Sequence, residues 1–251
     1  MTCKLILLRH GESIWNLENR FTGWTDVGLS ENGVEEAKNA GILLLNENLE
    51  IKTVYVSFLK RAIETSKLCL NQLQTGKFEV VYDWRLNERH YGSLQGLNKS
   101  ETAKKYGDAQ VLIWRRSFNT PPPPLSKKDK RHPKYDILYK NVDKTLLPDS
   151  ESLKDTLERV KPLWFNQILP KLRIGENVLI VAHGNSLRAI VKMIKNLSND
   201  EVLKLNIPTG VPYFFDFDEK LELIKDDYLG NKEEIAKKSQ LVANQSTQKI
   251  N

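Results

Sequence analysis

The chain has 251 residues, of which 40% are hydrophobic and 28% are charged, a balance typical of a globular protein with a full core. No apolar run approaches the roughly 20 residues of a membrane-spanning helix, and the N-terminus lacks the features of a secretory signal. We therefore expect a cytoplasmic protein that does not enter the membrane. The net charge of +6 suits nucleic acid or small anions, so charge alone does not decide between these partners.

Short apolar runs alternate along the chain with segments of helical spacing. The runs predict strands at residues 4–8, 53–57, 78–82, 178–182 and 213–217. The candidate N-caps of the helices are Ser30, Asn98, Asp108, Ser152 and Ser198. Strands that alternate with helices indicate an α/β fold, a three-layer αβα sandwich around a mostly parallel sheet.

Two segments depart from this alternation. Residues 119–149 form a long irregular excursion with a proline run and a basic cluster, Lys127–Lys134, which we interpret as a solvated loop that includes a solvated His132. From about Asp226 the chain becomes polar. We therefore expect a single catalytic domain over residues 1–230, with an inserted segment at about 84–150, and a mobile tail over 231–251.

A His-Gly pair follows two of the predicted strands. Arg9-His10-Gly11 follows the first strand, and His183-Gly184 follows the fourth, in a chain that has only four histidines. In α/β sheets, ligands bind where strands end and helices begin, and helix N-termini favour anions. A lone His-Gly pair is more often a turn than a catalyst, but adjacent parallel strands would bring His10 and His183 close together.

The residues around these pairs favour chemistry on a phosphate. A neutral imidazole is a nucleophile, and nearby arginines would disfavour its charged form. Arg9 offers a planar fork that matches phosphoryl oxygens. Arg61 follows the second predicted strand and could reach the same edge of the sheet, although on its own a surface arginine is the simpler interpretation.

Arg9-His10-Gly11-Glu12 resembles the signature of the histidine phosphatase superfamily. Further segments, in order along the chain up to about Gly230, resemble the cofactor-dependent phosphoglycerate mutases of that superfamily. The resemblance implies the histidine phosphatase fold. The segments that carry it are Asn16, Phe21–Trp24, Asp26, Gly28–Leu29, Arg85–Gly92, Trp114–Ser117, Pro121–Pro124, Glu151–Asp155, His183–Arg188 and Pro208–Pro212.

The resemblance also implies roles for individual residues. His10 would be the nucleophile, and Arg9, Arg61 and His183 would hold the transferring phosphoryl group. Glu88 would donate and accept the substrate proton; the simpler alternative is an acidic loop residue paired with Arg85 or Arg89. His90 would be structural. The substrate would be bound by Ser13, Asn16, Thr22, Gly23, Tyr91, Lys99, Arg115, Arg116, Gly184 and Asn185.

The implied activity is the interconversion of 3-phosphoglycerate and 2-phosphoglycerate in glycolysis and gluconeogenesis. It would proceed through a phosphohistidine, with 2,3-bisphosphoglycerate as primer and intermediate, without a metal, and with minor synthase and phosphatase activities. Cys3 and Cys69 match no metal motif. The resemblance further implies a homo-oligomer, a dimer or tetramer, and we expect residues 53–82 to form a contact. It also implies a closing element over the site, for which the tail is the candidate.

Four alternatives remain at this point. A bisphosphoglycerate mutase shares the framework, but Ser13 and the Thr22-Gly23 pair favour the glycolytic enzyme. A phosphatase would lack the 88–91 block and the long insert. A phosphate-binding scaffold without activity would have lost one of the five catalytic candidates, and none is missing. An RNA-binding protein would carry a recognised motif, and we find none.

Overall fold

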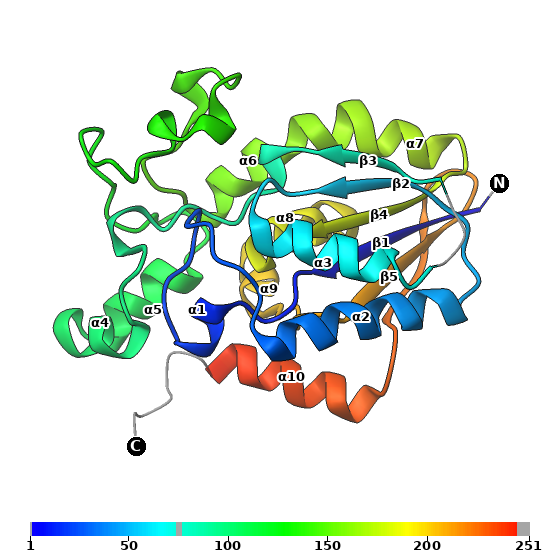
Figure 1. Cartoon of the computed structure of the whole chain (residues 1–251), viewed down its shortest axis with the longest axis horizontal. Helices are drawn as coiled ribbons and strands as arrows, with labels where there is room; N and C mark the ends of the chain where they lie inside the picture. Colours follow the sequence, from blue (N-terminus) through cyan, green and yellow to red (C-terminus); the bar gives the residue numbers. More distant parts are fainter. Residues whose placement is uncertain (1, 74–76, 245–251) are drawn as a thin grey trace.

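The structure is a computed structural model and describes residues 2–73 and 77–244 (Figure 1). Within these ranges six strands form one sheet in the order β3–β2–β4–β1–β5–β6. Strands β3, β2, β4 and β1 run parallel, whereas β5 is antiparallel to β1 and β6 to β5. The predicted mostly parallel sheet is confirmed. The strands are β1 (Cys3–Arg9), β2 (Ile51–Val56), β3 (Glu79–Tyr82), β4 (Asn177–Ala182), β5 (Pro212–Phe217) and β6 (Leu223–Tyr228).

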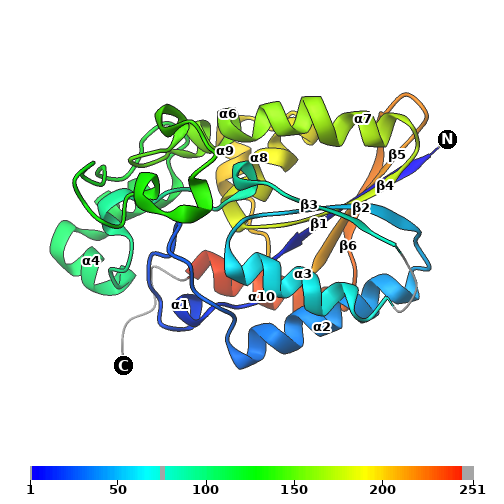
Figure 2. The ribbon, with the colours of Figure 1, turned by 45° about the horizontal axis from the view of Figure 1, so that its top comes forward.

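Helices cover both faces of the sheet, which gives the three predicted layers. Figure 2 shows α2, α3 and α10 on one side and α6, α7, α8 and α9 on the other. None of the helices in the described residues is long and apolar enough to cross a membrane. These elements are α2 (Glu31–Asn46), α3 (Lys60–Leu70), α6 (Leu153–Leu163), α7 (Leu169–Arg173), α8 (Gly184–Lys195), α9 (Asn199–Lys204) and α10 (Lys232–Asn244).

The two central strands supply both hydrophobic cores because successive side chains of a strand point to opposite faces. Leu5 and Leu7 of β1 join the core beneath α6 and α8. Ile6 and Leu8 join the core beneath α2 and α3. A strand buried on both faces reads as a continuous apolar run, which is why the first and fourth strands could be predicted from the sequence.

Residues 84–150 leave the sheet after β3 and gather beyond the carboxyl ends of the strands (Figure 1, green). They include α4 (Lys99–Tyr106) and α5 (Asp108–Arg116), and the short helix α1 (Ile14–Leu17) lies beside them. Lys127, Lys128 and Lys130 are exposed, as predicted. The solvated position predicted for His132 is wrong, because its ring is 2% exposed and its Nε2 lies 2.7 Å from Asp149 Oδ1.

Four of the five predicted N-caps are confirmed, and the fifth, Asp108, is wrong because it is the first residue of α5, whose N-cap is Gly107. The side chains of Ser30, Asn98, Ser152 and Ser198 each accept a hydrogen bond from a backbone N–H in the first turn of the helix that follows. Such bonds satisfy donors that have no partner inside the helix. Local chemistry therefore sets where these helices begin.

The C-terminal part of the chain is more regular than the sequence predicts. The polar segment expected from Asp226 begins inside β6, whose charged residues suit an edge strand because they oppose pairing with another chain. The predicted mobile tail begins with α10, where Asn231 Oδ1 accepts the N–H groups of Glu233 and Glu234. Residues 245–251 of that tail lie outside the described residues.

The turn after β1 packs directly on the N-terminal end of α2. A Cβ atom at Gly33 would lie 2.0 Å from the Glu12 carbonyl oxygen, and one at Gly11 would lie 2.2 Å from the Gly33 oxygen. Glu36 Oε2 accepts the Glu12 N–H at 2.8 Å, and Lys238 Nζ of α10 donates to Glu36 Oε1 at 2.8 Å. Helix α2 therefore holds the turn that carries His10.

We expect Gly33→Ala to destabilise the protein by about 1–3 kcal/mol, because the added methyl group meets backbone that cannot rotate away. The sign of this change in stability is informative, because replacing glycine by alanine within a helix ordinarily stabilises the helix. Urea denaturation measures the effect, and Asn39→Ala at an exposed position of the same helix is the control. Equal stability of the two variants would show that α2 can shift without cost.

Candidate active site

The parallel pairing of β1 with β4 brings the two His-Gly turns together. Arg9 is paired with Ala182, so His10 and His183 follow at the same level of the sheet. Their ring centroids lie 4.9 Å apart at 56°, and both side chains are buried. The prediction that these two histidines lie close together is confirmed.

The hydrogen bonds of His10 fix which nitrogen carries its lone pair. Nδ1 lies 2.7 Å from the carbonyl oxygen of Gly11, which only accepts, so the proton of the neutral ring is on Nδ1. The lone pair is then on Nε2, with Arg61 Nε at 3.4 Å. Burial, Arg61 and Arg9 lower the pKa of His10 well below its usual value. The ring is therefore neutral at pH 7, which is the state a nucleophile needs.

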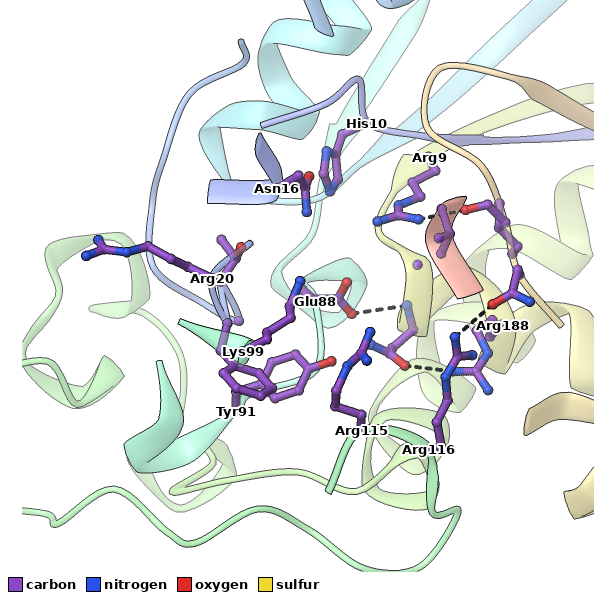
Figure 3. Close-up of a pocket in the computed structure, with 18 of the residues that line it drawn as sticks. Arg9, His10, Asn16, Arg20, Glu88, Tyr91, Lys99, Arg115, Arg116 and Arg188 are labelled. Carbon is purple, nitrogen blue, oxygen red and sulfur yellow. Dashed lines mark hydrogen bonds between the residues drawn. The ribbon is translucent and has the colours of Figure 1, made fainter. Parts of the chain in front are cut away.

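Cationic side chains surround the cavity beside His10 (Figure 3). Its lining includes six arginines and Lys99, whereas Glu88 is the acidic residue of the set. Burial, Arg115 and Arg9 lower the pKa of Lys99 to about 7, as expected for a buried amine among positive charges. In the described ranges no group of three His, Cys, Asp or Glu side chains could hold a metal ion. The arginines are Arg9, Arg20, Arg61, Arg115, Arg116 and Arg188.

Backbone oxygens hold several of these arginines. Arg61 donates to the carbonyl oxygens of Gly23 and Thr25 at 2.8 and 3.0 Å, and Arg9 donates to that of Ile207 at 2.7 Å. Arg61 is 1% exposed, so the alternative of a surface arginine is wrong. Because a carbonyl oxygen orients a guanidinium without neutralising it, the positive charge remains available to a bound anion.

Glu88 is held by backbone donors on two segments. Its Oε1 accepts the N–H of Arg89 at 2.8 Å and the N–H of Asn185, in the first turn of α8, at 3.1 Å. The predicted alternative, an ion pair with Arg85 or Arg89, is not formed, because Arg85 pairs with Asp83 and the Arg89 side chain donates to the carbonyl oxygen of Arg115. Glu88 is thus a carboxylate among cations that no arginine side chain engages directly.

A buried ion pair fixes the backbone on which Glu88 lies. Arg159 of α6 bonds both oxygens of Glu151 at 2.6 and 2.8 Å, and its Nη2 also donates to the carbonyls of Asn87 and Glu88 at 3.2 Å each. Glu151 Oε2 in turn accepts the N–H of His90 at 2.8 Å. A buried pair that fills its remaining hydrogen-bond positions in this way constrains local geometry strongly.

The cavity gathers thirteen of the fifteen predicted site residues and leaves out two. Ser13 is buried and caps α1, where it hydrogen-bonds Asn16. His183 lies next to His10 but outside the lining, with Nε2 directed to Ser57. The thirteen are Arg9, His10, Asn16, Thr22, Gly23, Arg61, Glu88, Tyr91, Lys99, Arg115, Arg116, Gly184 and Asn185.

The sequence did not predict several residues of the lining. Arg188 lies one turn after Gly184 on α8, so helical spacing could have identified it. Phe21 lies in the segment Phe21–Trp24 that carries part of the family resemblance, next to the predicted Thr22. None of the remaining residues was predicted from the sequence, and the fold brings them to the cavity: Arg20, Leu205, Asn206, Ile207 and Val242.

The buried histidines should make stability depend on pH. Burial is the main cause that lowers the pKa of His10, His183 and His90, the last to about 3. The unfolded chain binds more protons than the folded protein below pH 6.5, so stability should fall as the pH drops from 7 to 5.5. Each histidine contributes up to about 1.4 kcal/mol per pH unit.

Urea denaturation at several pH values measures this slope. His90→Asn is the comparison, because its side-chain oxygen can accept the Gly92 N–H that His90 Nδ1 accepts at 3.0 Å. The variant should lose about a third of the slope, one titrating group of three. Stability that does not change over this interval would contradict neutral rings.

Comparisons with known proteins identify the family of this chain. The model of the histidine phosphatase superfamily (branch 1) matches residues 5–131 and 124–225. A 2,3-bisphosphoglycerate-dependent phosphoglycerate mutase from Parabacteroides distasonis is 56% identical over 98% of this chain and 99% of its own length. A protein of the same name from Porphyromonas gingivalis is 53% identical over the same shares of the two chains.

Solved structures show the same fold at low identity. A mycobacterial glucosyl-3-phosphoglycerate phosphatase is 22% identical with a TM-score of 0.68 and covers 90% of this chain and 97% of its own. A putative alpha-ribazole-5'-P phosphatase from Escherichia coli is 19% identical with a TM-score of 0.66, covering 91% and 97%. Taken with the family match and the full-length relatives, these findings establish that the chain belongs to the histidine phosphatase superfamily.

Proposed function

We propose that this protein interconverts 3-phosphoglycerate and 2-phosphoglycerate as a 2,3-bisphosphoglycerate-dependent mutase, with minor synthase and phosphatase activities. The observation that carries the proposal is the neutral His10, with its lone pair on Nε2, in a cavity lined by cations. Full-length relatives at 53–56% identity carry the name of this activity. Glu88 supplies the acid–base group that transfer between two hydroxyls requires.

The residues present fit a polyanion. Six arginines and Lys99 face one carboxylate in the lining formed by described residues, and a bisphosphate with a carboxylate carries several negative charges. Bound 2,3-bisphosphoglycerate supplies the phosphoryl group that charges His10. Arg9 and Arg61 hold that group, while the start of α8 at Gly184 offers N–H donors to it. Tyr91, Lys99, Arg115 and Arg116 bind the second phosphate and the carboxylate.

Transfer to the substrate pairs one proton movement with one phosphoryl movement. The substrate hydroxyl gives its proton to Glu88 as its oxygen forms a bond to phosphorus. The N–P bond breaks, and its electron pair returns to His10 Nε2. In the reverse step Glu88 returns the proton to the departing oxygen. Positioned arginines stabilise the charge spread over the phosphoryl oxygens, which is the main source of catalysis in such transfers.

An enolase-coupled assay with 3-phosphoglycerate tests the proposal. The metal is removed from this protein beforehand, and Mg²⁺ is supplied for the coupling enzyme only. We expect strong stimulation by 2,3-bisphosphoglycerate and an acid-labile phosphoryl label on the protein. His10→Ala should lose both, whereas His132→Gln, in the loop segment at 119–149, should keep both. Phosphate release from phosphoesters without mutase turnover would assign the chain to the phosphatases instead.

We infer that α10 closes one side of the cavity. Val242 belongs to the lining, and Lys238 ties α10 to Glu36 of α2. Gly230, just before α10, is close to Leu43 of α2 and Ile235 of α10. A covering element excludes water, which would otherwise hydrolyse the phosphohistidine.

Truncation near Lys232 should therefore lower mutase turnover more than phosphoester hydrolysis. The reason is that the phosphorylated His10 becomes open to water while the cations that bind the substrate stay in place. Both rates are measured on the same preparation. A chain that ends at Asn244 keeps α10 and is the matched control. Unchanged kinetics in the shorter variant would refute a covering role for α10.

Domain organisation and assembly remain predictions. We propose a single catalytic domain over residues 1–230, located in the cytoplasm as a glycolytic role implies. We also propose a homo-oligomer with a contact through residues 53–82. The edge strand β3 lies in this range and leaves Val80 and Tyr82 37% and 44% exposed, which suits such a contact.

A further inference from the structure

A chain of buried polar groups runs from His183 into the inserted segment. His183 Nε2 lies 2.8 Å from Ser57 Oγ, and Ser57 Oγ lies 2.8 Å from Asn87 Oδ1. Asn87 Nδ2 then donates to the hydroxyl of Tyr139 at 2.9 Å. All four side chains are buried or nearly so, and none of them lines the cavity. The reaction proposed above gives no role to Ser57, Asn87 or Tyr139.

A backbone donor fixes the direction of every bond in this chain. The N–H of Phe58 donates to the same Asn87 atom at 3.1 Å, so that atom must be the amide oxygen. The amide oxygen cannot donate, so the single hydroxyl proton of Ser57 points to Asn87. Ser57 Oγ also accepts the N–H of Leu59 at 3.2 Å. Its remaining lone pair must accept from His183, which therefore carries a proton on Nε2.

The two neighbouring histidines are thus held in opposite tautomers. His10 keeps its proton on Nδ1, through the carbonyl of Gly11, and its lone pair on Nε2. Neutral His183 keeps its proton on Nε2 and its lone pair on Nδ1, and Nδ1 is buried without a hydrogen-bond partner in the part of the chain that the structure describes. Phosphate oxygens of a dianion only accept, so such a group can bond Nδ1 only when Nδ1 has gained a proton.

The surroundings of His183 decide when that proton is present. Burial and the nearby positive charges lower the pKa of His183 well below its usual value, so the ring is neutral while the cavity holds no anion. An anion beside His10 opposes those charges and favours the imidazolium. The charged and titratable groups around His183 are Arg9 at the end of β1, His10 directly after it, Arg61 on α3, Arg159 on α6, and Glu88 bonded to the N–H of Asn185.

We propose that Asn87, acting through Ser57, is a positioning residue that holds His183 as the Nε2–H tautomer, so that Nδ1 takes up one proton from the medium when a phosphate binds beside His10. The proposal rests on the proposed function for the identity of the natural anion. It adds that the second histidine changes charge during each transfer. The first histidine stays neutral until it is phosphorylated.

Nitrogen NMR of the full chain, labelled with ¹⁵N-histidine, tests the tautomer directly. The spectrum of His183→Gln assigns the signals, since the chain has only four histidines. At pH 7 we expect His183 to be neutral with its proton on Nε2. Saturation with inorganic phosphate should protonate both of its nitrogens. A proton on Nδ1 in the free protein, or a neutral His183 at saturating phosphate, would overturn the proposal.

Two variants separate the Asn87 contact from the rest of the chain of bonds. Asn87→Ala frees the Ser57 hydroxyl to donate to Nε2, so His183 should shift to the Nδ1–H tautomer and kcat should fall about tenfold with little change in KM. Tyr139→Phe keeps the Asn87–Ser57 bond and should retain the Nε2–H tautomer. An Asn87→Ala protein that keeps the Nε2–H tautomer would contradict the proposal.

The conservative replacement Asn87→Asp supplies a rescue. A carboxylate accepts from Ser57 as the amide oxygen does, so the Nε2–H tautomer should return, and the added negative charge should raise the pH at which His183 gains its second proton. A purely structural role for Asn87 predicts no such shift. If Asn87→Ala does not fold, the spectra of the wild-type protein still test the tautomer of His183. Their outcome does not depend on the result of the mutase assay.

Discussion

Among the described residues that line the cavity, six arginines and Lys99 face a single carboxylate, Glu88, so most of their positive charge is not neutralised, and the surrounding loops follow from that constraint. A buried charge is costly unless polar groups solvate it. Carbonyl oxygens do so here: those of Gly23 and Thr25 bind Arg61, and that of Ile207 binds Arg9. Each of these loops curves so that its backbone oxygen faces a guanidinium. The arginines are therefore fixed in place while their charge remains directed to the cavity.

The electrostatic field of these arginines and the local hydrogen bonds have separate effects on the histidines. Burial and the arginines keep His10 and His183 neutral, but a field does not choose between the two nitrogens of a ring. The choice comes from single short contacts, to a carbonyl at Gly11 and to a hydroxyl at Ser57. The same positive environment can thus contain two neutral rings whose lone pairs lie on different nitrogens because their hydrogen-bond partners differ.

The sequence predicts the part of this site that local pattern determines. Apolar runs that end in His-Gly indicate buried parallel strands, and their adjacency follows once the sheet is parallel. Taken by itself, Arg61 is predicted to be a surface residue. It is buried because it lies in the first turn of α3, which follows β2. The segment from Leu205 to Ile207 and the end of α10 reach the cavity through long connections. No spacing rule encodes such connections, so the sequence could not place them.

Two further failures of prediction have one cause. Strand β6 is charged because it lies at an edge of the sheet, where polar side chains meet water, and composition alone cannot tell such a strand from a tail. His132 lies in a basic segment yet is buried against Asp149. In both cases the composition of a segment describes its average environment, whereas the contacts of the individual residue decide its burial.

The pair Asn87-Glu88 shows how one short segment can contribute both to the hydrogen bonds of His183 and to the cavity. Asn87 has backbone angles of φ −55° and ψ 159°, close to those of polyproline II, so its side chain and that of Glu88 leave the backbone in different directions. Asn87 thus reaches Ser57, while Glu88 reaches the cavity and the first turn of α8. Arg159 binds both of their carbonyl oxygens. A shift of this backbone would displace the Glu88 carboxylate and the partner of His183 together, so the Glu151–Arg159 ion pair keeps these two parts of the site in register.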